Sequence, residues 1–176
     1  MKATYNIDPA HSSAQFSVRH MMISNVRGGF GSVKGTVVYD SDNPGESIID
    51  ATIDATTINT LDAQRDAHLK SADFFDVEKF PTLNFKSTSV RRTGDEELSV
   101  TGDLTIRGVT KSVTLAVNDL SEPSKDPWGN QRIGLSASAK VNRKDFGLVW
   151  NAPLELGGML VGDEVAITLD VQFIKA

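Results

Sequence analysis

Apolar and polar residues alternate along most of the chain, so that each alternating segment has one apolar face and one polar face. The clearest segment is 164–174, where Val165, Ile167 and Leu169 share a face that Glu164 and Thr168 do not. A period of two residues is typical of half-buried β-strands. Together with 164–174, the same pattern predicts about eight strands, the others lying at 13–20, 28–39, 49–55, 82–91, 97–107, 111–118 and 132–142.

Several connections between these segments are short and rich in turn-forming residues, among them 42–45 (DNPG), 93–95 (TGD) and 128–130 (WGN). Short turns join antiparallel neighbours, because parallel strands need long crossovers. Glycines also occur inside the expected strands, where they indicate bulges or sharp bends in a curved sheet. These glycines are Gly31, Gly35, Gly102 and Gly134.

One stretch departs from the alternation and favours a helix. Residues 61–70 (LDAQRDAHLK) are rich in helix formers, and Thr60 or Asp62 is suited to cap the helix at its N-terminus. Residues 71–76 are expected to form a second short turn before the next strand. We find no repeat, low-complexity tract or linker, so we expect residues 1–176 to form a single domain that is all-β apart from this helical excursion at 61–76.

Strands with a single apolar face can pair into a two-sheet sandwich or close into a barrel, and periodicity does not separate the two. An eight-stranded barrel is just wide enough to be filled by side chains or to hold one small ligand. The expected inner face includes many small residues, which indicate unfilled volume unless bulky neighbours cover them. The small positions are Ala14, Ala51, Ala55, Ser87, Gly102, Ala137 and Ala139.

Composition narrows the function classes. The chain has no cysteine, which excludes disulfides, thiolate nucleophiles and cysteine-ligated metals, and its net charge of −5 argues against nucleic acid as a partner. No apolar run approaches the roughly 20 residues of a membrane span. The N-terminus lacks the apolar stretch of a signal peptide. We therefore expect a cytoplasmic protein, or a periplasmic one if the natural N-terminus has been trimmed.

The residues suggest no catalytic or metal centre. The three histidines, His11, His20 and His68, match no metal-ligand spacing, and Asp66 and His68 point apart on a helix. There is no nucleophile elbow around a serine, and the glycines at 28–31 lack the order of a phosphate-binding loop. We expect no cofactor, no metal and no enzymatic activity.

Six segments together resemble the YceI family of bacterial polyisoprenoid-binding proteins. Each segment is weak evidence alone, but they occur in the family's order and span nearly the whole chain. They are 8–12 (DPAHS), 16–21 (FSVRHM), 26–30 (VRGGF), 65–76 (RDAHLKSADFFD) with 80–81 (FP), 102–111 (GDLTIRGVTK) and 143–148 (RKDFGL).

The resemblance implies a lipocalin-like, eight-stranded antiparallel barrel whose apolar lumen carries a long-chain isoprenoid or similar fatty, amphipathic lipid. It favours a hollow barrel over a filled one. It also implies binding, storage or transport rather than catalysis, with a homodimer possible. Two alternatives stay open: an enzyme acting on a lipid or quinone through His68 with Asp66 or Asp73, and a ligand-free, stress-related interaction module.

The predicted ligand-binding residues fall into three groups. The cavity wall is assigned to residues on the apolar strand faces, namely Phe16, Val18, Ile53, Leu83, Phe85, Leu104, Leu135, Ala137 and Leu169. The mouth or the deep end is assigned to apolar residues near connections, namely Phe30, Phe74, Phe146, Leu148 and Trp150. A polar head group is assigned to Arg19, His20, Arg65 and His68.

Overall fold

The computed structural model describes all 176 residues, most of them in β-strands. The strands are β1 (Lys2–Ile7), β2 (Ser13–His20), β3 (Ser24–Phe30), β4 (Val33–Asp40), β5 (Ile48–Asp54), β6 (Thr82–Gly94), β7 (Glu97–Ile106), β8 (Val109–Asn118), β9 (Ser124–Lys125), β10 (Gln131–Asn142) and β11 (Val161–Lys175). The one α-helix is α1 (Ala63–Lys70), and four 3-10 helices lie at η1 (Pro9–His11), η2 (Pro44–Glu46), η3 (Ala55–Thr57) and η4 (Arg143–Phe146).

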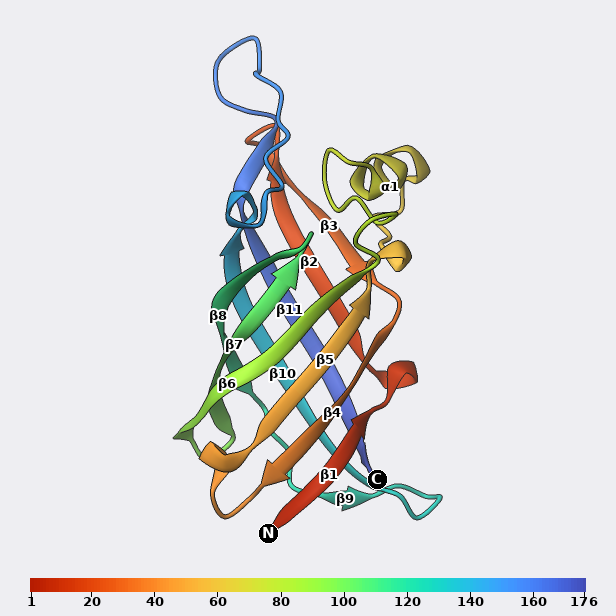
Figure 1. Cartoon of the computed structure of the whole chain (residues 1–176), viewed down its shortest axis with the longest axis vertical. Helices are drawn as coiled ribbons and strands as arrows, with labels where there is room; N and C mark the ends of the chain where they lie inside the picture. The colour runs from red at the N-terminus through yellow and green to blue at the C-terminus, as the bar shows by residue number, and fades with distance from the viewer.

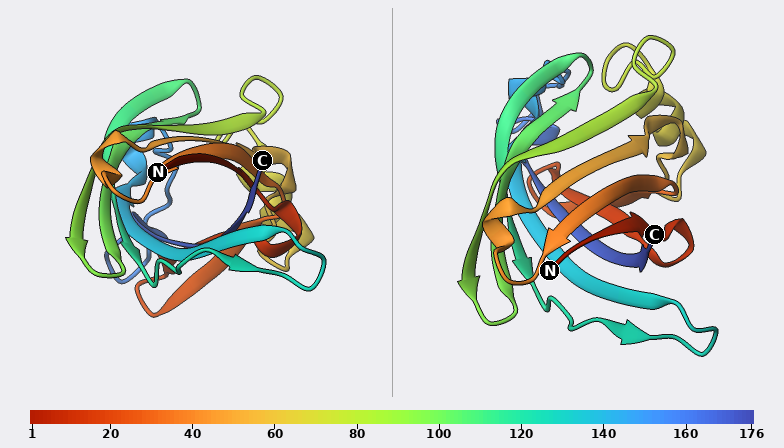
Figure 2. Two further views of the ribbon diagram at one scale, coloured as in Figure 1. Left: turned by 90° about the horizontal axis from the view of Figure 1, so that it is seen from below. Right: turned by 60° about the horizontal axis from the view of Figure 1, so that its bottom comes forward.

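Eight strands close into an antiparallel barrel, seen end-on as a ring in Figure 2. The order around the ring is β11, β1, β4, β5, β6, β7, β8 and β10, and β10 pairs with β11 again. The closing pair is long, running from Arg132 opposite Ile174 to Asn142 opposite Glu164. Closure puts every apolar strand face on the inside, which confirms the expected all-β barrel with one short helix.

The edge of β11 opposite β10 is shared by two strands. Near the chain ends it pairs with β1, where Tyr5 lies opposite Lys175, and farther up it pairs with β2, where Phe16 lies opposite Ile167. β2 then pairs with β3, and an isolated bridge joins Gly29 to Asn59 beyond β5. β1 with β2, and β3 with β4, thus each occupy one position of the barrel in two pieces (Figure 1).

Two strand predictions need correction. The segment predicted at 28–39 is two strands, β3 and β4, because the chain bends at residues 31–32. β1 was not predicted, although Tyr5 and Ile7 are buried at alternate positions. It was missed because an apolar face of so few residues gives a weak periodic signal.

The predicted helix is confirmed at Ala63–Lys70, and Asp62 rather than Thr60 caps it. The Asp62 carboxylate accepts a hydrogen bond from the Arg65 backbone N–H at 3.0 Å. Thr60 instead donates to Asp66 through its hydroxyl and its backbone N–H. Residues 71–76 form turns after the helix, which matches the expected second turn.

The two ends of the barrel differ. Both termini lie at the lower end in Figure 1, whereas the β2–β3 turn, α1 and the loop between η4 and β11 gather at the upper end. We call the upper end the mouth end. None of the helices has the length and apolar character needed to cross a bilayer.

Candidate ligand cavity

The barrel encloses two adjoining chambers. The upper chamber, at the mouth end, has a volume of about 680 Å³, and the lower chamber has a volume of about 190 Å³. Their linings have residues in common, so they meet at one level of the barrel. The shared residues are Phe16, Phe30, Leu83, Ile106 and Ile167.

The lower chamber is almost purely apolar. Of its 31 lining residues 29 are hydrophobic, and the exceptions are Gln15 and Ser47. The Ser47 hydroxyl is already engaged, because it accepts a hydrogen bond from the Asp40 backbone N–H at 3.1 Å. A chamber with this lining offers a ligand no polar partner, so it suits a hydrocarbon chain.

Small residues account for part of this empty volume. Four of the seven predicted positions line the lower chamber, namely Ala14, Ala51, Ala137 and Ala139. The other three do not line either chamber. Ala55 is fully buried beside the upper chamber, the Ser87 hydroxyl accepts a hydrogen bond from Ile49, and the Phe85 ring covers Gly102.

Gly102 lies in β7 opposite an irregularity in β6, as expected for a glycine inside a strand. A Cβ at this position would lie 2.5 Å from Cζ of Phe85 and 2.6 Å from the backbone oxygen of Lys86, so no side chain fits there. The strand opposite has a bulge between Ser87 and Ser89, which confirms the expected irregularity at this point. The Phe85 ring thereby lies against β7, and it lines the lower chamber.

The upper chamber combines an aromatic wall with polar groups. Phe74 and Phe146 are buried, and the His68 ring packs edge-on against Phe74 and Trp150, with centroid distances of 5.1 and 4.6 Å. The Nε2 atom of His68 lies 2.8 Å from a carboxylate oxygen of Asp73. His68 therefore presents an oriented imidazole at the boundary between the apolar wall and solvent.

Arg65 is fixed beside His68 by its own neighbours. Its guanidinium donates to the Thr60 hydroxyl and to the Thr60 backbone oxygen, each at 2.8 Å. Arg19 and His20 are the last two residues of β2. Arg19 is exposed, and His20 is half-buried. All four residues line the upper chamber, which groups the predicted polar head site at the mouth end.

Each predicted site residue lines at least one of the two chambers, and contact with a ligand stays a prediction for all of them. Phe16, Phe30 and Leu83 lie where the chambers meet, which places Phe30 at mid-barrel rather than at the mouth or the deep end. The upper chamber alone has Val18, Arg19, His20, Arg65, His68, Phe74, Phe146, Leu148 and Trp150. The lower chamber alone has Ile53, Phe85, Leu104, Leu135, Ala137 and Leu169.

Sequence reasoning missed a second set of lining residues. Val165 and Ile167 share the apolar face of β11 with Leu169, so the same alternation could have found them. Arg143 also lines the upper chamber, and it is the most deeply buried basic residue there. The neighbouring sequence does not predict that Arg143 is buried, since two charged residues, Lys144 and Asp145, follow it.

Asp66 and His68 do not act together, as their helical spacing predicted. Asp66 accepts hydrogen bonds from Thr60, whereas His68 pairs with Asp73. Of the two carboxylates considered as partners for His68, Asp66 and Asp73, only Asp73 forms a hydrogen bond with it. It orients the imidazole toward the aromatic wall described above.

Comparison with known sequences places these observations in a family. The model of the YceI-like domain matches residues 5–173. The YceI protein of Escherichia coli O157:H7 is 42% identical over 175 residues, which cover 98% of this chain and 87% of that protein. The YceI protein of a Salmonella newport strain is 38% identical over the same coverage.

Solved structures show the same barrel. BcnA of Burkholderia cenocepacia superposes with a TM-score of 0.82 at 22% identity, covering 94% of this chain and 98% of BcnA. The YceI protein of Campylobacter jejuni gives 0.76 at 28% identity and 90% coverage of both chains. A polyisoprenoid-binding domain from Saccharophagus degradans gives 0.70 at 14% identity over all of both chains.

Proposed function

The chain belongs to the YceI-like family, and from this premise we propose that it binds a long-chain isoprenoid or a similar amphipathic lipid in its lumen. The proposed role is storage or transport of the lipid, without chemical conversion. A structural neighbour is described as a polyisoprenoid-binding domain, which supports this ligand class.

The observation that carries the proposal is the pair of adjoining chambers, apolar at depth and polar at the mouth. A tail that extends from the upper chamber into the lower one would meet hydrocarbon and aromatic surface along its length. Burying about 300 Å² of apolar tail contributes roughly 7 kcal/mol at about 25 cal/mol per Å². The cost of ordering the tail subtracts from this figure.

The polar groups at the mouth end define the orientation that we propose. Arg65 and His68 are held in place by Thr60 and Asp73, so they require little reorganisation to meet a polar or anionic head group. The reverse orientation would bury the head group in the lower chamber. There its hydrogen bonds to water would be lost without replacement.

Native mass spectrometry of the freshly purified protein, followed by organic extraction and lipid mass analysis, tests the proposal. We expect a stoichiometric extra mass that extracts as a long-chain isoprenoid or a fatty derivative. If the bare chain stays bare after incubation with long-chain isoprenols and isoprenoid quinones, the proposal is wrong.

Conversion of the extracted lipid on incubation with the protein would instead support an enzyme. The His68–Asp73 pair is where such an activity would be sought, by comparing wild type with His68→Ala. An unchanged lipid over hours supports the storage or transport role.

A further inference from the structure

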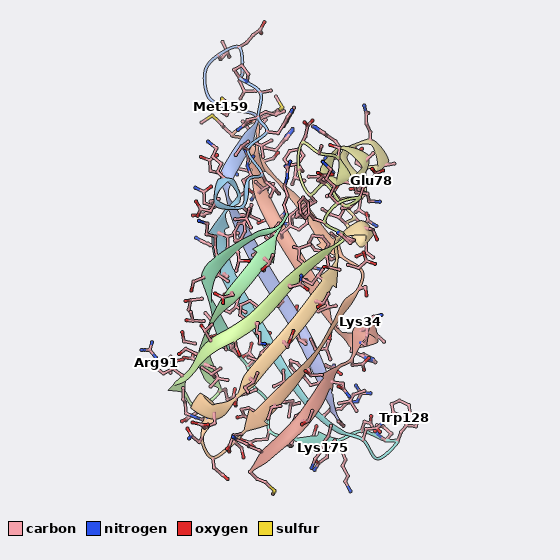
Figure 3. All side chains as sticks on the ribbon, in the orientation of Figure 1. Lys34, Glu78, Arg91, Trp128, Met159 and Lys175 are labelled. Atoms are coloured by element: carbon pink, nitrogen blue, oxygen red, sulfur yellow. The ribbon has the colours of Figure 1, made fainter.

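Exposed apolar side chains concentrate around the mouth of the barrel. Of the ten large hydrophobic residues that are exposed, seven belong to segments of the mouth end. We call these seven the rim residues, and they are Met21, Met22, Ile23, Leu61, Val149, Leu156 and Met159. The remaining three, Met1, Ile48 and Trp128, belong to the lower half, and Figure 3 shows Met159 and Trp128 at opposite ends of the molecule.

Two of the rim segments form one continuous surface. The backbone N–H of Met21, in the β2–β3 turn, donates to the Leu160 oxygen at 2.8 Å. The Met22 side chain lies against Gly158 so closely that a Cβ there would overlap its sulfur. The β2–β3 turn and the loop before β11 therefore present their apolar side chains together.

The rim is continuous with the cavity. Leu160, which anchors Met21, lines the upper chamber, and so does Trp150 beside the exposed Val149. Leu61 immediately precedes Asp62, another residue of the upper chamber. A binding partner that contacts the rim residues would thus lie directly over the entrance to the upper chamber.

The backbone adopts the left-handed conformation at three of the rim residues. Six non-glycine residues have a positive φ, and three of them are the rim residues Met21, Met22 and Leu61, at 52°, 60° and 63°. Glycine or asparagine adopts this left-handed conformation at lower cost. Leu61 gains almost nothing from burial in the protein itself, since it is 94% exposed, whereas Met21 and Met22 are 44% and 60% exposed.

Charge also distinguishes the two ends. The segments of the mouth end, 19–27, 61–80, 107–111 and 142–165, contain nine Lys or Arg and nine Asp or Glu, so they carry no net charge. The rest of the chain carries the whole net charge of −5. An anionic surface would therefore repel the segments of the mouth end less than it repels the rest of the barrel.

We propose that the rim residues form a docking surface for a lipid bilayer, on which the barrel sits mouth first with its apolar tips among the head groups and upper acyl chains. The proposal rests on the proposed lipid cargo, because such a cargo is donated and received by a bilayer. An apolar rim around the entrance lets the tail pass between membrane and lumen without crossing water.

Cosedimentation with protein-free phosphatidylcholine vesicles tests the docking surface. Wild type should bind, and binding should persist in about 0.5 M NaCl because apolar insertion is not screened by salt. The variant Ile23→Asp with Leu156→Asp should bind about tenfold more weakly. Both side chains are exposed, at 75% and 102%, so the fold should tolerate the changes.

The matched control is Ile48→Asp with Trp128→Asp, which introduces the same two charges at apolar residues of the lower half that are 53% and 81% exposed. This variant should bind vesicles like wild type. Absence of wild-type binding, or equal loss in the control, would overturn the proposal and point to a protein partner for the rim instead.

A lumen variant separates this proposal from the proposed cargo. Ala137→Trp, which fills the lower chamber, should reduce the bound lipid but leave vesicle binding unchanged. The rim variant should show the reverse, keeping its lipid while losing the vesicles. Loss of both properties together in the rim variant would contradict a separate docking role.

Discussion

Among individual residues, Arg143 shows how a buried charge shapes the mouth of the cavity. Its side chain is 5% exposed, and it donates to the backbone oxygens of Leu148 at 2.6 Å, Trp150 at 2.9 Å and Gly162 at 2.7 Å. Burial lowers the pKa of Arg143 from its usual value, and Asp163 opposes this effect. The guanidinium thus ties the segment that carries Trp150 to the start of β11.

Replacing this residue tests its role as a structural tie. Arg143→Lys keeps the charge but supplies three donors in place of five, so backbone oxygens lose their partners. We expect the free energy of unfolding to fall by about 2–4 kcal/mol, measured by urea denaturation. Lys144→Ala, at the exposed neighbouring position, should change it by less than about 0.5 kcal/mol. Equal effects of the two substitutions would contradict the assignment.

Ala137 is one of the small residues in the wall of the lower chamber. It is 3% exposed and lines the lower chamber, paired with Val117 on β8 and Leu169 on β11. In Ala137→Trp the indole should occupy the lower chamber, so the affinity for long tails should fall by at least about tenfold, or about 1.4 kcal/mol. Short-chain isoprenols, which the upper chamber can hold, should bind as in wild type. Titration with isoprenols of increasing length measures this difference, and unchanged affinity for every length would contradict the role of the lower chamber.

Among secondary-structure elements, an ionic cluster joins η1, β10 and the turn after β9 at the lower end. The Arg132 guanidinium lies 2.7 Å from carboxylate oxygens of both Asp8 and Asp126. His11 lies 2.9 Å from the same oxygen of Asp8. Arg132 and His11 hold the pKa of Asp8 at about 2, and Arg132 with Asn130 lowers the pKa of Asp126 further below its usual range.

Acid should therefore weaken the barrel through this cluster. Because the folded-state pKa of Asp8 is lowered, its stabilising contribution is complete above its usual pKa near 3.8 and is lost as the pH falls toward 2. We expect the urea midpoint to decrease through this window. In Asp8→Asn the decrease should be shallower, whereas Asp103→Asn, at an exposed site on β7, should keep the wild-type profile. Identical profiles for all three proteins would exclude the cluster as a cause.

The molecule as a whole is a barrel whose interior its own side chains leave partly empty. A close-packed core gains dispersion contacts on every side, and residues that line an empty chamber lose part of them. A cargo that fills the chambers restores these contacts. The folded state should therefore be more stable with its ligand than without it.

Removing the lipid should lower the melting temperature, and adding a long-chain isoprenol should restore it. A ligand at a hundred times its Kd adds about 2.7 kcal/mol, which corresponds to roughly 5–10 °C for a chain of this length. Differential scanning calorimetry of extracted and refilled protein measures the shift. Ala137→Trp is the control, and it should show a smaller shift with the longest tails. A melting temperature that is insensitive to both steps would argue against a lipid-filled lumen.

Much of the fold follows from local patterns in the chain. The alternation in β10 and β11 identified which side chains face the interior, because a strand with one apolar face must bury that face. Asp62 and the residues of α1 contain their own helix signals. The short strand β1 and the bend between β3 and β4 were not predicted, since their local signals are weak. Pairing with distant strands stabilises them, because β1 pairs with β11 and β4 pairs with β5.

The chain therefore specifies, through local periodicity and turn chemistry, the strands, their antiparallel sense and the apolar lining at positions such as Phe16 and Leu169. Closure into a barrel and the empty volume inside it depend on strands far apart in sequence. The pairing of Ala137 with Leu169 and the place of the Phe85 ring on Gly102 are contacts of this kind. The same holds for the tie between Arg143 and β11, and for the gathering of Ile23 and Leu156 at one rim. Local patterns reflect only the preferences of neighbouring residues, whereas packing volume and surface continuity arise when distant segments meet.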